Sequence, residues 1–346
     1  MRNIVLVVLA SFCACTLGLS LFPPRISSAR AAPAEGARRV IVFPPVLAAY
    51  ATIDEGCDHI AGASALGAEE QVSHDPLYAA NPCLNEVAPM ATLPRGTTFP
   101  SDPEQVLLRD PDAVLTWPGA APGLEAVGLP LVNVRSLNAS GGAVESWRLL
   151  GTLAGKLPRA EQLLRTTEAE DARVLRAVEQ FTGTRPRFLL MWNLEDSKTF
   201  FLGPPFYGPA LDLGNLHGIN LAPQHQVGRA DVEELFVLDP DVIFLTRQNP
   251  ELFYRQPQLS PLRAVRERKI YRVPAFGGRL ERLVPDHALY LSWAAELLYP
   301  EQMTNDTRSR LRNLYRLDEA TLDRALFLDE NGLSAHYERF RGPATR

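Results

Sequence analysis

Short apolar runs alternate with helical patterns along the first third of the chain. Residues 40–43 form a β-branched run that two prolines end, which predicts a buried strand. Residues 46–53 then carry a helical pattern, and residues 112–117 and 131–134 are two further strand candidates. Strands that alternate with helices are typical of an α/β fold built on parallel strands.

One helix–turn–strand unit occurs twice. Residues 102–115 read Asp-Pro-Glu-Gln-Val-Leu-Leu-Arg-Asp-Pro-Asp-Ala-Val-Leu, and residues 231–244 read Asp-Val-Glu-Glu-Leu-Phe-Val-Leu-Asp-Pro-Asp-Val-Ile-Phe. In each copy an aspartate is placed to cap a helix, and a glutamate follows in the first turn, where the helix dipole favours an acid. After an apolar helix face, Asp-Pro-Asp ends the helix because proline cannot continue it, and a buried strand follows. The repeat predicts two lobes of similar construction.

A long helical segment separates the two copies. Residues 143–156 predict one helix, and Pro158, which suits a first helical turn, opens a second helix that runs to about Phe181. A helix of about 24 residues is about 36 Å long, which is enough to connect two lobes as a strut. Residues 188–192 predict the first strand of the second lobe. The apolar face of the long helix consists of Leu163, Leu164, Val174, Leu175 and Val178.

These patterns divide the chain into five parts. We expect a signal peptide at 1–31, an N-terminal lobe at 32–142, a helical connection with the linker helix at 143–182, a C-terminal lobe at 183–300 and a C-terminal helical extension with a tail at 301–346. Within the extension, residues 304–328 predict two short amphipathic helices, with Asp318 as an N-cap. Residues 329–346 are polar, and we expect them to be loose.

The N-terminus has the features of an export signal. Arg2 gives it a positive start, residues 4–21 are mostly apolar, and Ala29-Arg30-Ala31 offers the small residues that a signal peptidase needs. We therefore expect a periplasmic protein whose mature chain begins at Ala32. Two alternatives stay open: an uncleaved membrane anchor, and a lipid anchor on Cys13 or Cys15, although the residues before these cysteines match a lipobox poorly.

Charge excludes one class of partner. Loss of residues 1–31 removes three arginines and no acids, so 32 basic residues face 40 acids and the net charge moves from −5 to −8. A nucleic-acid partner would require a basic face, so we expect none.

Two cysteines remain in the mature chain, Cys57 and Cys83. An oxidising compartment allows them to form a disulfide. In the chain-entropy model such a bond across about 26 residues contributes about 3 kcal/mol to stability. The alternative is a pair of buried thiols; neither the spacing nor the neighbours suggest a zinc site.

Together these segments resemble the substrate-binding proteins of ABC importers for iron chelates, haem and cobalamin. The resemblance covers about residues 38–328. It implies an α/β fold of two Rossmann-like lobes with a ligand cleft between them, joined by a long connecting helix. The segments that carry it are 40–45, 58–64, both Asp-Pro-Asp units, 151–156, 213–214 with 218–220, and 293–301.

The resemblance also implies what the protein does. Such a protein captures a metal chelate, here an iron-siderophore, haem or cobalamin-like compound, and delivers it to an ABC permease and its ATPase. It acts as a monomer, touches the membrane only through the permease, holds no cofactor and is not an enzyme. Each lobe presents one glutamate to an arginine pocket of the permease, and the matching positions are Glu104 and Glu233. The alternative is that both are only favourable first-turn acids.

The ligand site of a two-lobed α/β protein lies outside the carboxyl ends of its strands. Residues near these ends are mostly aromatic, with one arginine in an expected loop, which suits a flat chelate that is anionic or carries a metal. The alternative for each aromatic residue is a place in the core. The candidates are Pro45, Tyr50 and Trp117 in the first lobe, and Trp192, Tyr207, Phe276 and Arg279 in the second.

Three other functions compete with chelate transport. A receptor for a bare metal ion would need three or four converging ligands, but the six histidines are scattered, and His217 and His225, which flank a loop, are better explained as exposed or capping residues. A secreted hydrolase would need a catalytic motif, and no Gly-x-Ser-x-Gly or Ser-x-x-Lys set stands out. A sensor or scavenger would bind ligand without a transporter. We therefore expect no catalytic residue and no metal-binding residue.

Overall fold

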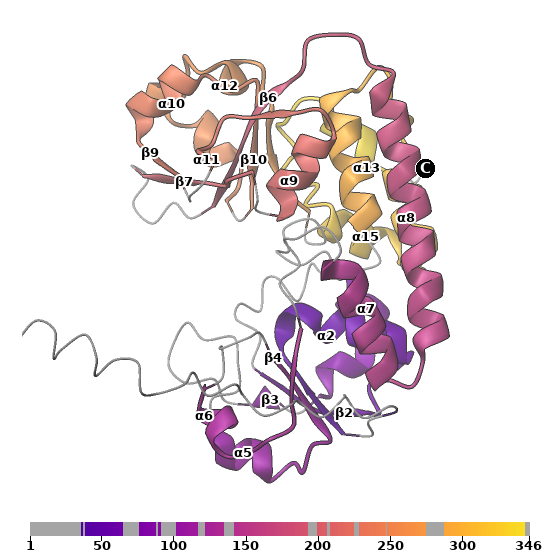
Figure 1. Ribbon diagram of the computed structural model, residues 1–346. Coiled ribbons are helices and arrows are strands. Elements are labelled where there is room, and N and C mark those ends of the chain that lie inside the picture. The colour runs from indigo at the N-terminus through magenta and orange to yellow at the C-terminus, as the bar shows by residue number, and fades with distance from the viewer. Residues whose placement is uncertain are drawn as a thin grey trace, which may run out of the picture. The chain divides into compact units, whose positions relative to one another are not determined.

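The computed structural model describes residues 36, 39–64, 76–87, 89–90, 102–116, 122–134, 142–192, 199–205, 208–224, 228–246, 248–274 and 287–342. The expected signal segment lies outside these residues. Among the described residues, no helix combines the length and apolarity that a membrane crossing requires. Two β-sheets, each with its own helices, form the body of the protein (Figure 1).

The first sheet is wholly parallel, with strand order β3-β2-β1-β4-β5. Alternate residues of its strands point to opposite faces, so Val40 and Val42 join a core with α2 and α7, while Ile41 and Val114 join a core with α5 and α6. The strands are β1 (Val40–Val42), β2 (Ile60–Ser64), β3 (Pro89–Met90), β4 (Ala113–Thr116) and β5 (Leu131–Asn133); the helices are α2 (Pro44–Asp54), α4 (Pro76–Ala80), η1 (Pro82–Asn85), α5 (Pro103–Leu107), α6 (Pro122–Ala126) and α7 (Gly142–Leu153).

The second sheet is mixed, with strand order β11-β10-β6-β7-β9 and β8 beside β6. Strand β7 runs antiparallel to β6 and β9, and the other pairings are parallel. Its strands are β6 (Arg187–Trp192), β7 (Phe200–Leu202), β8 (Ile219–Asn220), β9 (Gly228–Ala230), β10 (Val242–Leu245) and β11 (Ile270–Arg272).

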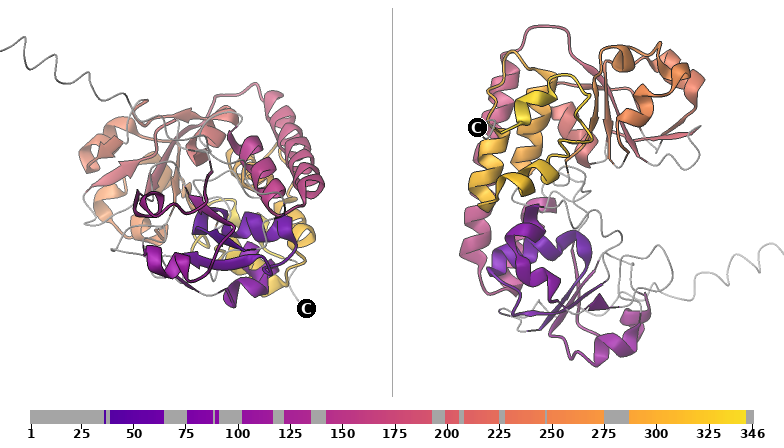
Figure 2. Two further views of the ribbon diagram at one scale, coloured as in Figure 1. Left: turned by 60° about the horizontal axis from the view of Figure 1, so that its bottom comes forward. Right: turned by 180° about the vertical axis from the view of Figure 1, so that it is seen from behind.

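Helices cover both faces of this second sheet (Figures 1 and 2). Leu189 and Ile243 face the core formed with α10 to α12, whereas Phe188 and Phe244 face α9, α13 and the C-terminal segment. The helices are α9 (Gly208–Asn215), α10 (Val232–Leu238), α11 (Glu251–Tyr254), η2 (Pro257–Leu259), α12 (Arg263–Arg266), α13 (His287–Leu298), α14 (Thr307–Tyr315), α15 (Glu319–Ala325) and η3 (Tyr337–Phe340).

Helix α8 (Leu157–Glu179) connects the two lobes, close to the predicted limits. Its first half places Ala160 and Leu163 in the core of the first lobe, and its second half places Val174 and Val178 in the core of the second. The chain therefore has two α/β lobes joined by a long helix, as expected. The five boundaries proposed from the sequence stay a prediction.

Residues 151–156 determine how α8 packs against α7 and follows it in the chain. A Cβ atom on Gly151 would lie 2.6 Å from the Cβ of Ala160, so only glycine lets α7 approach α8 this closely. Gly155, between α7 and α8, adopts a left-handed φ of +64°, which allows the chain to turn sharply before α8 begins. The ammonium group of Lys156 then donates a hydrogen bond to the carbonyl of Asp54 at the end of α2.

The prediction that residues 329–346 are loose is wrong for residues 329–342. Asn331 is fully buried, and its side chain accepts the N–H of Arg272 and donates to the Arg272 carbonyl on the edge strand β11. Tyr337 and Phe340 are buried against each other, and Tyr337 stacks on Tyr271. Few apolar residues suffice here because each one fills a space left by a distant part of the chain, which composition alone does not reveal. Helices α14 and α15 match the two predicted ones, and Asp318 caps the second.

Candidate functional site

The sequence repeat is also a structural repeat. Helix α5 leads into β4, which pairs with β1, the first strand of the first sheet. Helix α10 leads into β10, which pairs with β6, the first strand of the second lobe. The two copies therefore occupy equivalent places in the two sheets, as the repeat predicts. We call them the α5–β4 unit (residues 102–116) and the α10–β10 unit (residues 231–245).

The last aspartate of each Asp-Pro-Asp joins its unit to the first strand of the lobe. The carboxylate of Asp112 accepts the backbone N–H of Arg39 at 3.0 Å, and the N–H of Asp112 donates to the Arg39 carbonyl at 2.8 Å. Asp241 makes the same two bonds with Arg187, each at 2.8 Å. The aspartate at this position therefore extends the strand pairing through its side chain.

The side chains of the same two arginines hold the end of each helix. Arg39 donates to the carbonyls of Arg109 and Asp110 at 2.9 and 3.1 Å. Arg187 donates to the carbonyls of Leu238 and Asp239 at 2.7 and 3.2 Å. These carbonyls have no partner within the helix, so an arginine satisfies them and its charge opposes the negative end of the helix dipole.

Sequence reasoning missed Arg39 and Arg187. The signal that was present is their position, since Arg39 directly precedes β1 and Arg187 is the first residue of β6. The first aspartate of each Asp-Pro-Asp, Asp110 or Asp239, has a left-handed φ of 44° or 34°, which turns its carbonyl toward the arginine.

The N-terminal ends of the two helices leave one glutamate free in each unit. Asp102 accepts the N–H of Glu104 at 3.0 Å, and Asp231 accepts the N–H of Glu234 at 2.9 Å. Glu234 returns a bond to the N–H of Asp231, so it completes a capping box. Glu104 and Glu233 are exposed, and within the described part of the chain their carboxylates make no hydrogen bond or ion pair.

Two of the ligand candidates in the described part of the chain, Pro45 and Trp192, belong to the segments at the ends of the central strands β1 and β6. Pro45 is the second residue of α2, directly after β1, and Trp192 is the last residue of β6. In the first sheet all carboxyl ends meet at one edge, because its strands are parallel. Trp117 follows the last residue of β4 in the sequence. Trp117, Tyr207, Phe276 and Arg279 themselves lie outside the described residues.

Tyr50 is a core residue, which corrects its place among the ligand candidates. Its side chain is fully buried on the inner face of α2, among Val46, Leu47 and Ile53. Burial raises the pKa of its hydroxyl well above the usual range, and the nearby Asp54 carboxylate acts in the same direction. Because the ring faces the core, we remove Tyr50 from the ligand set.

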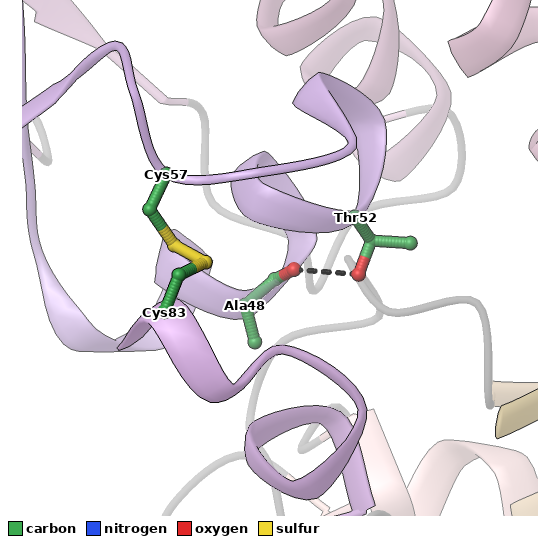
Figure 3. The surroundings of a disulfide bond; sticks show 4 residues. All are labelled: Ala48, Thr52, Cys57 and Cys83. Atoms are coloured by element: carbon green, nitrogen blue, oxygen red, sulfur yellow. Dashed lines mark hydrogen bonds between the residues drawn. A yellow bond between two sulfur atoms is a disulfide. The ribbon is translucent and has the colours of Figure 1, made fainter. Parts of the chain in front are cut away.

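Cys57 and Cys83 form a disulfide in the structure (Figure 3). Their Cα atoms are 5.9 Å apart, and the bond ties the turn after α2 to η1. In α2 beside it, the hydroxyl of Thr52 donates to the carbonyl of Ala48 at 2.8 Å, as Figure 3 shows. The bridge therefore holds two surface segments of the first lobe together.

Comparison with known proteins now decides the family. A family model for periplasmic binding proteins matches residues 62–275, which is more than half of the chain and includes both repeated units. This chain belongs to the periplasmic binding protein family. The members of the family are solute-binding proteins of ABC transporters, which work with a permease and an ATPase and are not enzymes.

Solved structures share the fold. A periplasmic solute binding protein from Veillonella parvula has a TM-score of 0.72 and 20% identity over 86% of this chain and 94% of its own. MolA from Haemophilus influenzae, bound to molybdate, has a TM-score of 0.66 and 16% identity over 83% and 95%. Ceue from Helicobacter pylori, with Ni(II) bound, has a TM-score of 0.64 and 16% identity over 86% and 96%. A search of curated protein sequences finds no significant match.

Two of the histidines in the described part of this periplasmic binding protein, His59 and His287, pair with carboxylates. His59 pairs with Asp54 at 2.9 Å, and His287 lies between Asp171 at 3.1 Å and Asp212 at 2.8 Å. His217 has a left-handed φ of 59° after α9 and offers its carbonyl to Arg185, while His225 lies outside the described residues. Within the described ranges, no three His, Cys, Asp or Glu side chains are grouped to hold a metal ion.

Proposed function

We propose that this periplasmic binding protein captures a metal chelate, of the iron-siderophore, haem or cobalamin kind, and delivers it to the permease of an ABC importer. The main support for this proposal is the pair of exposed carboxylates of Glu104 and Glu233, which occupy equivalent positions in the α5–β4 and α10–β10 units. If these glutamates capped their helices, their carboxylates would accept backbone N–H groups. The capping hydrogen bonds are made by Asp102, Asp231 and Glu234 instead.

Two matched acids suit a partner that has two equivalent halves. Arginine is the side chain that best recognises an exposed carboxylate, because its guanidinium group can donate two parallel hydrogen bonds. Each unit is held to its strand by the same aspartate and arginine bonds, so each glutamate is presented from a rigid element. The proposal therefore assigns one permease contact to each lobe.

The chelate is proposed to bind between the lobes, at the carboxyl ends of the strands. Pro45 is the second residue of α2, which follows β1, and Trp192 is the last residue of β6. In the sequence Trp117 comes after β4, Tyr207 after β7, and Phe276 and Arg279 after β11. Aromatic rings with one guanidinium group suit a flat anionic compound. Two proteins with the same fold are described with molybdate and with Ni(II), which supports a metal-bearing cargo and also favours a bare ion as the second candidate.

Export and assembly complete the proposal. We infer that residues 1–31 direct export and are removed before Ala32, that Cys57 and Cys83 stay paired in the periplasm, and that the mature protein works as a monomer. Contact with the membrane is then made only through the permease.

Native mass spectrometry tests the cargo directly. The mature protein is incubated separately with haem, cobalamin, several ferric siderophores, Fe(III), Ni(II) and molybdate. The proposal expects a 1:1 complex with one of the chelates and weaker binding of that chelate by Arg279→Ala. Arg255→Ala, at an exposed arginine directly after α11, is the matched control and is expected to bind normally. Binding of a bare ion alone would replace the proposal by the second candidate.

A further inference from the structure

The two most exposed large apolar side chains in the described part of the protein occupy equivalent positions. Leu108 in the α5–β4 unit and Val237 in the α10–β10 unit are each 85% exposed. The residue before each is also exposed, Leu107 by 51% and Phe236 by 37%. The remaining exposed large apolar residues reach at most 52% and are spread singly over other elements; they are Val127, Leu157, Ile219, Leu252, Leu314 and Leu333.

Each apolar pair shares a helix face with the free glutamate. Residues three and four positions apart lie side by side on a helix, so Glu104 is next to Leu107 and Leu108. In the second lobe Glu233 is next to Phe236 and Val237 in the same way. Each unit therefore presents one carboxylate beside one apolar pair.

The opposite side of each helix anchors it to its lobe. Val106 in α5 and Leu235 in α10 are fully buried, and they occupy equivalent positions in the two copies. In α10 the half-buried Val232 and Leu238 pack against the same core as Leu235. The apolar residues of each helix are thus divided into those that pack on the lobe and an exposed pair that belongs to no core cluster. A single exposed apolar residue needs no explanation, but the same pair on both lobes does.

We propose that Leu107–Leu108 and Phe236–Val237 are apolar contact patches by which each lobe seats on the permease, beside the Glu104 and Glu233 contacts. This inference rests on the proposed function. The partner surface in each half of the permease is then a basic side chain next to an apolar depression (the helices concerned are α5 and α10 in Figure 1).

The charge of Glu104 and Glu233 favours the permease over two other partners that could cover the apolar patches. A second copy of this chain, meeting the first through the same patches, would bring like carboxylates together, which opposes association. Anionic lipid headgroups would repel the same acids. A permease surface with basic residues is attracted to them, and the apolar pair then loses its contact with water on docking.

The two kinds of contact have separable effects. Burial of apolar area contributes mainly to affinity, whereas complementary charge contributes mainly to orientation and to the rate of association. Loss of the apolar side chains should therefore weaken docking without changing its dependence on salt. Loss of the carboxylates should weaken docking and reduce that dependence.

The experiment measures docking to the permease–ATPase complex that this protein serves, reconstituted in nanodiscs, as a dissociation constant at two salt concentrations. The apolar variant is Leu108→Ser with Val237→Ser. It is expected to raise the dissociation constant about tenfold to a hundredfold, because each substitution removes an apolar side chain buried on docking. The matched control, Leu252→Ser with Leu333→Ser, removes apolar side chains that are 52% and 48% exposed and is expected to dock normally. Far-UV circular dichroism and thermal denaturation check that each variant is folded.

The carboxylate variant, Glu104→Gln with Glu233→Gln, separates the two hypotheses. If it weakens docking while the apolar variant does not, the apolar patches are refuted and the proposed function stands. If neither variant weakens docking, the docking part of the proposed function fails as well. Equal binding of the unmodified protein to nanodiscs without transporter, or a dimer in sedimentation that the apolar variant abolishes, would overturn the inference in favour of lipid or of a second copy.

Discussion

The α5–β4 and α10–β10 units share one set of contacts but belong to lobes that are stabilised in different ways. Both units have an aspartate N-cap, an arginine on the end of the helix, an aspartate joined to the first strand and a free glutamate beside two exposed apolar residues. Around them, the first lobe carries a disulfide, whereas the second is covered by α13 to α15 and the C-terminal segment.

This difference distinguishes contacts that both lobes share from contacts that stabilise one lobe alone. Contacts found in both copies hold the helix rigidly and present the same surface. Contacts found in one copy, such as the bond from Arg263 to Asp241 at 2.6 Å, add only to local stability. Two kinds of mutation test this difference between the lobes. One removes a contact that only one lobe has, and the other removes a shared contact from each lobe in turn.

Removal of the disulfide is expected to have the largest effect and to be confined to the first lobe. Cys57→Ala with Cys83→Ala should lower the free energy of unfolding by about 3 kcal/mol in the chain-entropy model. Hydrogen exchange followed by mass spectrometry should show the loss in residues 39–64 and little change in residues 287–342. Reduction of the unmodified protein is the control. Equal destabilisation of both segments would mean that the lobes do not differ in this way.

The two arginines test a contact that both units share. Arg187→Ala should cost about 2 kcal/mol and Arg39→Ala about 1 kcal/mol, since both lose charge-assisted bonds to helix-end carbonyls but Arg187 is the more buried of the two. Arg176→Ala, at an exposed arginine on α8, is the matched control and should be close to neutral. Urea denaturation measures all three. A neutral Arg187→Ala would show that the shared contact does not hold the helix.

The buried Glu296 on α13 of the second lobe is expected to make the stability of the protein depend on pH. Its carboxylate accepts hydrogen bonds from the N–H groups of Asp306 and Thr307 and from the Thr307 hydroxyl, so it holds the start of α14. Burial raises the pKa of Glu296. A carboxyl group whose pKa is higher in the folded state contributes stability at low pH and loses it as pH rises through the folded pKa.

Glu296→Gln removes this dependence while keeping an acceptor oxygen. The free energy of unfolding of the variant, relative to the unmodified protein, should therefore increase between pH 4 and pH 8. Chemical denaturation at several pH values measures the change. A relative stability that decreases over this range would contradict the raised pKa.

The larger elements could be predicted from the sequence because each carries its own periodicity. The long helix, the repeated units and the strands at 40–43, 112–117, 131–134 and 188–192 follow from local pattern alone. Strands β8 and β9 could not be predicted, since two or three residues do not establish an alternation. The packing of residues 329–342 was missed because it depends on bonds from Tyr337 to Trp293 and from Asn331 to Arg272, which are more than 40 residues away in the sequence.

The candidate site could be predicted only in part, for a related reason. Glu104 and Glu233 were proposed from the family resemblance, at equivalent positions of the repeat. The exposed pairs beside them required the burial of each residue to be known. An aromatic residue after a strand suits both a core and a ligand site, so the sequence did not separate Tyr50 from Trp192. Tyr50 proved to be a core residue.

The most direct test of the account is uptake by the reconstituted transporter with both glutamates reversed. Glu104→Lys with Glu233→Lys is compared with Glu179→Lys with Glu301→Lys, a control that changes the same charge at two exposed glutamates elsewhere. The account predicts that the first variant binds its chelate normally but supports no more uptake than transporter without binding protein, while the control transports at the normal rate. Normal uptake with both Glu104 and Glu233 reversed would contradict it.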